Sequence, residues 1–213
     1  MKRKRSRKKY LIIVIIFISI YFCTTIFNNN CNLKYLESEG IYNYNNVDIL
    51  ELEENLHIKR IDYHWERTQS GINHPKVIVF HHSDATIMSP EEVNEIHKEK
   101  GWDGIGYHYY IRKDGTIYAG RPEEIIGSHV YGDNRNTIGI CLEGDFEDEE
   151  PTKEELNSLV NLSVYLILKY NMYECKGHND LYNTKCPGEL FPKEYIKERI
   201  YNELINLTEK EDN

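Results

Sequence analysis

The pattern of apolar and polar residues predicts strands and helices in alternation. Val77–Phe80 is a continuous apolar run, typical of a sheet strand that is buried on both faces. Asp114-Gly115 is a hairpin turn signal, and the residues on either side of it have strand character. The expected strands are 76–82, 107–111, 116–119, 137–142 and a short one that ends at His178.

The expected helices are marked by their caps as well as by their apolar stripes. Ser89–Glu92 combines an N-cap serine, a proline at the first position and a glutamate at the third, and predicts a helix that ends by residue 101. His97 on this helix is expected to face solvent. Thr152–Glu155 opens the longest helix, to about residue 170, and a last amphipathic helix is expected over 192–207. The fold class is therefore α/β, with a central mixed β-sheet flanked by helices.

The amino-terminal pattern predicts a membrane anchor in front of this fold. Residues 2–9 carry seven positive charges, and Leu11–Phe27 is an uncharged apolar run, about 25 Å long as a helix. No small-x-small cleavage site follows, so we favour an uncleaved signal anchor over a cleaved signal peptide. Because positive charge resists translocation, we expect a single-pass protein of the cell membrane with its domain on the extracytoplasmic side.

Composition divides the chain into four parts. We expect a basic cytoplasmic tail at 1–9, a transmembrane signal anchor at 10–27, a spacer at 28–57 with one short element near Val47–Leu52, and a globular domain at 58–213. The chain has 26 basic and 35 acidic residues, and only 19 of the basic ones lie beyond the tail, which leaves a net charge of −16 there. Such a domain has no affinity for nucleic acid through phosphate attraction.

Candidate metal chemistry lies in the segment 177–188. His178 and Cys186 are eight positions apart in a stretch too rich in Asn, Asp, Pro and Gly to be a helix, and imidazole nitrogen and thiolate sulfur are zinc ligands. Among nine His and five Cys, one such pair is a weak signal by itself. A third ligand is expected at the end of the first strand, from either His81 or His82. Adjacent strand residues point to opposite faces, so only one of them can join the site, and the spacing leaves open which.

Six motifs that occur in one order connect these elements to a known family. They are Phe80–Thr86, Gly101–Tyr109, Lys113–Arg121, Gly127–His129, Asn136–Leu142 and Gly177–Gly188. Together they resemble the type-2 N-acetylmuramoyl-L-alanine amidases, the superfamily of phage T7 lysozyme and the peptidoglycan recognition proteins. The resemblance covers about residues 75–192, without the anchor or the spacer.

The resemblance implies an enzyme that uses zinc (Zn2+) in a cleft at the strand ends. His81, His178 and Cys186 match the family's metal ligands, and Tyr107 matches its active-site tyrosine. The implied reaction is hydrolysis of the amide bond between N-acetylmuramic acid and L-alanine of peptidoglycan, on the cell-wall side. Contacts to the glycan strand or stem peptide are expected from His129, Asn136, Thr184 and Lys185. For His129 and Asn136, hydrogen bonds that fix their loop are the alternative.

Three points stay open at this stage. Cys141 stands where some relatives carry a catalytic carboxylate, so the general base is unassigned, and Glu143 is nearby. The alternative function is a membrane-anchored peptidoglycan-binding sensor with little or no hydrolysis. The oligomeric state is unknown. Among the cysteines, we expect Cys186 to be a metal-bound thiolate, with Cys141 and Cys175 as the candidate disulfide pair.

Overall fold

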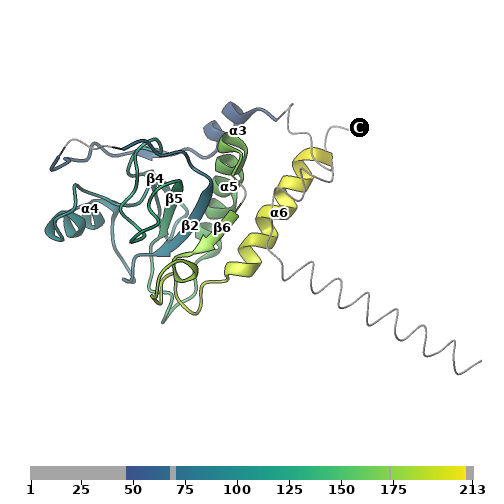
Figure 1. Ribbon diagram of the computed structural model, residues 1–213. Coiled ribbons are helices and arrows are strands. Elements are labelled where there is room, and N and C mark those ends of the chain that lie inside the picture. The colour runs from purple at the N-terminus through teal and green to yellow at the C-terminus, as the bar shows by residue number, and fades with distance from the viewer. Residues whose placement is uncertain (1–46, 68–70, 173, 210–213) are drawn as a thin grey trace, which may run out of the picture.

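The computed structural model describes residues 47–67, 71–172 and 174–209, and these form a six-stranded sheet with helices on both faces (Figure 1). The strands are β1 Lys59–Arg60, β2 Val77–His82, β3 Tyr109–Ile111, β4 Ile117–Ala119, β5 Thr137–Leu142 and β6 Glu174–Gly177. The helices are α3 Ile49–Asn55, α4 Pro90–Glu99, α5 Lys153–Tyr170 and α6 Lys193–Glu209, with a 3-10 turn, η1, at His178–Asp180.

The strand order is β1-β4-β3-β5-β2-β6, and the sheet is mixed as predicted. The β3–β4 hairpin is antiparallel, whereas β1–β4, β3–β5, β5–β2 and β2–β6 are parallel pairs. In the centre, β2 pairs in register with both neighbours: His81 lies opposite Cys141 of β5, and Phe80 lies opposite Gly177 of β6. The carboxyl ends of β2 and β6 therefore meet at one edge of the sheet.

The two faces of the sheet differ in character. Ile78 and Phe80 of β2 belong to the large apolar core with α5 and α6, which Figure 1 shows on the side of the sheet away from α4. The other face carries a smaller cluster that includes Tyr110 and Cys141. Since side chains alternate along a strand, the odd-numbered residues of β2 and β5 lie on this second face.

The predicted helix starts are confirmed. Ser89 caps α4 and Thr152 caps α5, each with a complete capping box, and α5 stops at Asn171 in the left-handed conformation with φ 50°. The exposure predicted for His97 is wrong. Its ring is buried and its Nδ1 accepts a hydrogen bond from the backbone amide of Gly106 at 2.9 Å, so the polar histidine is satisfied inside the protein.

Helix α3 lies within the segment that was expected to be a spacer. Asp48 caps it by accepting hydrogen bonds from the amides of Leu50 and Glu51, and Ile49, Leu52 and Leu56 pack against the large core. The packed part of the chain therefore extends to Ile49. The expected anchor at 10–27 lies outside the described residues, and within those residues no helix is long and apolar enough to cross a membrane.

Glu155, the third residue of α5, is fully buried. One of its carboxylate oxygens accepts a hydrogen bond from the Thr152 amide at 2.8 Å, while the other has no hydrogen-bond partner among the described residues. Burial raises the pKa of Glu155 from 4.5 to about 7. The folded protein thus holds this proton more tightly than the unfolded chain. The resulting stabilisation is full below pH 4.5 and is lost as the pH rises through about 7.

We therefore expect Glu155→Gln to change the pH dependence of stability. The glutamine keeps an oxygen for the cap but does not ionise. Relative to the parent protein, its free energy of unfolding should rise by about 1–2 kcal/mol between pH 5 and pH 8, seen as several degrees in melting temperature. Glu154→Gln, an exposed change in the same turn, is the control, and its pH profile of stability should run parallel to that of the parent protein. Parallel pH profiles for Glu155→Gln and the parent would contradict the assignment.

Candidate metal centre

Three predicted ligands converge at the carboxyl edge of the sheet. His81 is the fifth residue of β2, His178 opens η1 directly after β6, and Cys186 comes from the loop that follows. One ligand atom from each lies within 4.8 Å of the others. The Cys186 Sγ is 3.6 Å from the His81 Nδ1, and the rings of His81 and His178 are 4.6 Å apart between centroids.

The loop that carries Cys186 is shaped by its own backbone. The amide of Asn179 donates to the carbonyl of Cys186 at 2.8 Å, which closes the loop from His178 to Cys186. The amide of Cys186 donates to the Thr184 Oγ1 at 3.3 Å, and the amide of Gly188 donates to the carbonyl of Lys185 at 2.7 Å. Gly188 has φ 102°, which favours glycine at this bend.

The donor set fits zinc. Burial lowers the pKa of both His81 and His178, so both imidazoles are neutral and offer a lone pair. The His178 Nε2 is buried and has no hydrogen-bond partner in the described structure, which is costly unless the atom binds something else. Burial also raises the pKa of Cys186 to about 12, so a metal must displace the thiol proton. Two nitrogens and one sulfur are ligands that Zn2+ binds tetrahedrally, with one position left for water.

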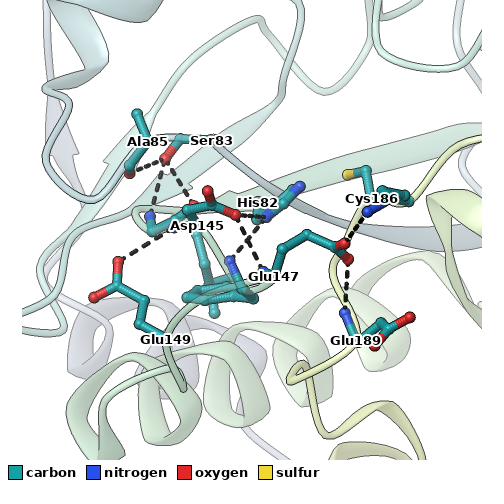
Figure 2. A network of polar contacts seen from close by, with 12 residues as sticks. His82, Ser83, Ala85, Asp145, Glu147, Glu149, Cys186 and Glu189 are labelled. Atoms are coloured by element: carbon teal, nitrogen blue, oxygen red, sulfur yellow. Dashed lines mark hydrogen bonds and ion pairs between the residues drawn. The ribbon is translucent and has the colours of Figure 1, made fainter.

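Of the two histidines at the strand end, His81 is the one that lies with His178 and Cys186. His82 points to the other face, where its Nδ1 accepts from the amide of Phe146 at 3.0 Å and lies 3.9 Å from the Asp145 carboxylate (Figure 2). His82, Asp84 and Asp145 could also be taken for a metal-binding group by their distances. Because the His82 Nδ1 already accepts a backbone proton, this corner is held together by hydrogen bonds of its own.

Tyr107 lies beside the ligand cluster, as predicted. Its ring centroid is 5.1 Å from that of His81, and its hydroxyl lies near the Cys141 thiol. Burial raises the pKa of Tyr107 well above its ordinary value, so the hydroxyl keeps its proton at neutral pH. The site therefore contains one uncharged O–H donor next to the candidate ligands.

Glu143 is not a free general base. Its carboxylate is buried and accepts from the Arg112 Nε at 2.6 Å, from the Lys113 amide at 3.1 Å and from the Met88 amide at 2.8 Å. Three donors, one of them a guanidinium, therefore hold this carboxylate in place and occupy its acceptor positions.

The four residues expected to bind substrate lie in different surroundings, and their role stays a prediction. His129 is buried, with its Nδ1 3.0 Å from the His81 Nε2. Asn136 precedes the amino end of β5, and its amide donates to the Asn73 Oδ1 at 2.8 Å. Thr184 supports the Cys186 backbone. Lys185 is largely exposed and pairs with Glu147 at 2.6 Å, and the amide of Glu189 donates to the same carboxylate at 3.0 Å.

The expected disulfide is wrong. Cys141 is on β5 and Cys175 on β6, and β2 runs between them. Along β2, Cys141 lies opposite His81, whereas Cys175 lies opposite Ile78. One strand and three register positions separate the two sulfurs, which is too far for a bond that needs Cα atoms within about 7 Å.

Two contacts of the candidate ligand cluster were not predicted from the sequence. The ring of Tyr182 stacks on that of His178 at 5.9 Å and 24°. Thr137 completes a hydrogen-bonded series through its Oγ1, which is 3.2 Å from the His129 Nε2. The four-residue spacing of His178 and Tyr182 was a readable signal. The contact of Thr137 with His129 had none, since it depends on how a loop folds over β5.

The fold and the cluster define a class: a mixed α/β domain with a His-His-Cys ligand set at its strand ends, beside a tyrosine hydroxyl. Residues 71–189, more than half of the chain, match the N-acetylmuramoyl-L-alanine amidase family, and the chain belongs to that family. The chain is 39% identical to the endolysin of Enterobacteria phage T3 over 119 residues, which span 52% of this chain and 79% of the endolysin.

Two solved structures support the same assignment. N-acetylmuramoyl-L-alanine amidase LysC from Clostridium intestinale URNW is 48% identical, with a TM-score of 0.66 over 67% of this chain and 96% of that chain. Peptidoglycan recognition protein-LE, in complex with tracheal cytotoxin, is 27% identical, with a TM-score of 0.58 over 64% of this chain and 87% of that chain. The resemblance inferred from the six motifs is thereby confirmed.

Cys186→Ala should distinguish a metal ligand from a residue that only lies near the site. Loss of one of three ligand atoms should lower zinc affinity by more than about 100-fold and remove the stabilisation that bound metal confers. Metal content by mass spectrometry and melting curves with and without zinc measure both effects. Lys185→Ala, one residue away and exposed, is the control and should keep its zinc. A Cys186→Ala protein that retains stoichiometric zinc would show that the thiol is not a ligand.

Proposed function

We propose that this protein is a zinc-dependent N-acetylmuramoyl-L-alanine amidase that hydrolyses the amide bond between N-acetylmuramic acid and L-alanine of peptidoglycan. The observation that carries the proposal is the convergence of His81, His178 and Cys186 within 4.8 Å in a chain that belongs to this family. The ligand of peptidoglycan recognition protein-LE, tracheal cytotoxin, is a monomeric diaminopimelic acid-type peptidoglycan, and this supports the same substrate class here.

The residues of the site have separate tasks. His81, His178 and Cys186 would hold zinc, which supplies Lewis-acid polarisation of the amide carbonyl and an activated water at neutral pH. Tyr107 would donate its O–H to the oxygen on which negative charge develops. A donor that is already in place contributes about 3–4 kcal/mol to such a step.

The surroundings of the Tyr107 hydroxyl suit this task. The side chain near it is the Cys141 thiol, and sulfur is a weak acceptor, so the hydroxyl is not held strongly. Turning the hydroxyl towards an oxyanion therefore costs little and gains a charge-assisted hydrogen bond. A carboxylate in the place of Cys141 would instead compete with the substrate for the same proton.

The proposal is tested on purified cell wall. The zinc-loaded protein should release stem peptides with a free L-alanine amino terminus and leave intact glycan strands, as identified by mass spectrometry of the soluble fraction. Cleavage within the glycan or within the peptide would refute the assigned bond. Tight binding to the wall without release of peptide would favour the sensor alternative.

Tyr107→Phe removes the donor and keeps the ring. We expect kcat to fall by about 100- to 1,000-fold, with KM, zinc content and melting temperature almost unchanged, because the hydrogen bond forms mainly in the transition state. Tyr118→Phe on β4 makes the same chemical change away from the ligands and should keep full turnover. Near-normal turnover of Tyr107→Phe would make this tyrosine a packing residue only.

We also propose that residues 10–27 anchor the protein in the cell membrane, with the amidase domain on the cell-wall side. The support is sequence alone: seven positive charges in 2–9, followed by an uncharged apolar run. Protease added to protoplasts should remove the domain and leave a short membrane-bound fragment. If the domain stays protected while a known surface protein is digested, the proposed topology is wrong.

A further inference from the structure

His129 lies between a candidate metal ligand and the first residue of β5. Its Nδ1 is 3.0 Å from the His81 Nε2, and its Nε2 is 3.2 Å from the Thr137 Oγ1. Only 6% of its surface is exposed. A cleft-lining residue that reads substrate would point its ring nitrogens outward, whereas both nitrogens of His129 are engaged inside the protein.

The hydrogen bonds that link His81, His129 and Thr137 are all donated in the same direction. The Thr137 Oγ1 is 3.1 Å from the carbonyl oxygen of Asp133 and 3.0 Å from that of Asn134, and both can only accept. The single hydroxyl proton must therefore go to one of these carbonyls, so Thr137 accepts from the His129 Nε2–H. A neutral His129 then has a bare Nδ1, which accepts from the His81 Nε2–H.

The last step of this series determines which nitrogen of His81 is available to a metal. With its proton on Nε2, a neutral His81 has its lone pair on Nδ1. That nitrogen is the one that faces the Cys186 Sγ at 3.6 Å. In the other tautomer, an N–H would point at the metal position and the imidazole could not serve as a ligand.

The surroundings keep the His129 ring from turning. A Cβ added to Gly139 would lie 2.6 Å from the His129 Cγ, and one added to Gly127 would lie 2.4 Å from its Cδ2, so only glycine fits at either position. The backbone amide of His129 donates to the Asn134 Oδ1 at 2.7 Å. The His108 ring closes the site edge-on at 5.5 Å. This packing fixes the direction in which the ring nitrogens point.

We propose that His129 is the positioning residue of the metal centre: through Thr137 and its own Nδ1, it fixes His81 in the tautomer that presents Nδ1 to the metal. The inference rests on the proposed function only in that it takes His81 as a ligand. For His129, this role replaces the expected contact with substrate. A neutral histidine orients a ligating histidine through a hydrogen bond and adds no charge to the metal site.

The matched pair His129→Asn and His129→Leu tests the proposal. The Asn Oδ1 occupies nearly the place of the His Nδ1 and keeps the acceptor for His81, whereas leucine fills the space without one. We expect zinc affinity, measured by competition with a chromophoric chelator, to fall 10- to 100-fold in His129→Leu and less than about fivefold in His129→Asn. Equal losses in the two variants would mean that the ring acts by packing alone and would overturn the proposal.

A second readout needs neither zinc nor activity. In the metal-free protein, 15N chemical shifts of the imidazoles should show His81 protonated on Nε2 in the parent and as a mixture of tautomers in His129→Leu. Thr137→Val is nearly isosteric and keeps the protein testable if the leucine variant does not fold. It should release the tautomer of His129 and lower zinc affinity about three- to tenfold. The proposal would be refuted if His81 of the parent carries its proton on Nδ1, or if the tautomer of His129 is unchanged in Thr137→Val.

These results are distinct from those that test the proposed function. If zinc binds with the expected order of affinities but no stem peptide is released from the wall, the amidase assignment fails and the role of His129 stands. If peptide is released and both His129 variants bind zinc like the parent, the amidase assignment stands and the role of His129 fails.

Discussion

The in-register pairing of β2 with β5 and β6 is the constraint on which the site depends. It sets His81 beside Cys141 on one side and brings the end of β6, with His178, to the other side. The apolar pattern enforces this register: β5 places Ile138, Ile140 and Leu142 in the core with α5 and α6. Its alternate positions, Thr137, Gly139 and Cys141, are small. A slip of one residue would turn the large residues into the space that the rings of His129 and Tyr107 need.

The same separation of faces decides where charge can lie. Around the ligands, burial lowers the pKa of His81, His108 and His129, and the site is built from neutral donors and acceptors. Carboxylates nearby are paired with cations at its margins, Glu143 with Arg112 and Glu147 with Lys185. An unpaired buried charge costs several kcal/mol, so this arrangement leaves the Cys186 thiol as the one group of the candidate ligand cluster that would become charged on metal binding.

Sequence patterns predicted those features that depend on neighbouring residues. The caps at Ser89 and Thr152, the Asp-Gly turn and the strand 137–142 are local signals, and each was found where expected. The errors lie where distant segments meet. The burial of His97 depends on the amide of Gly106, and the candidate Cys141–Cys175 disulfide required a strand order that periodicity does not give. The candidate ligand set was predicted from the order of the six motifs and from the strand ends. Spacing within one segment could not predict it, because residues 81 and 186 lie in distant segments.

The partner that orients His81 is a neutral imidazole, that of His129. A ligating histidine is commonly oriented by a carboxylate, which adds negative charge behind the ligand and makes it more basic. With zinc bound, Cys186 would contribute one negative charge to a dication, and a carboxylate behind His81 would reduce the remaining positive charge further. Orientation through His129 and Thr137 keeps the geometry without that loss. A thiolate-containing centre can in this way retain the electrophilic character that amide hydrolysis requires.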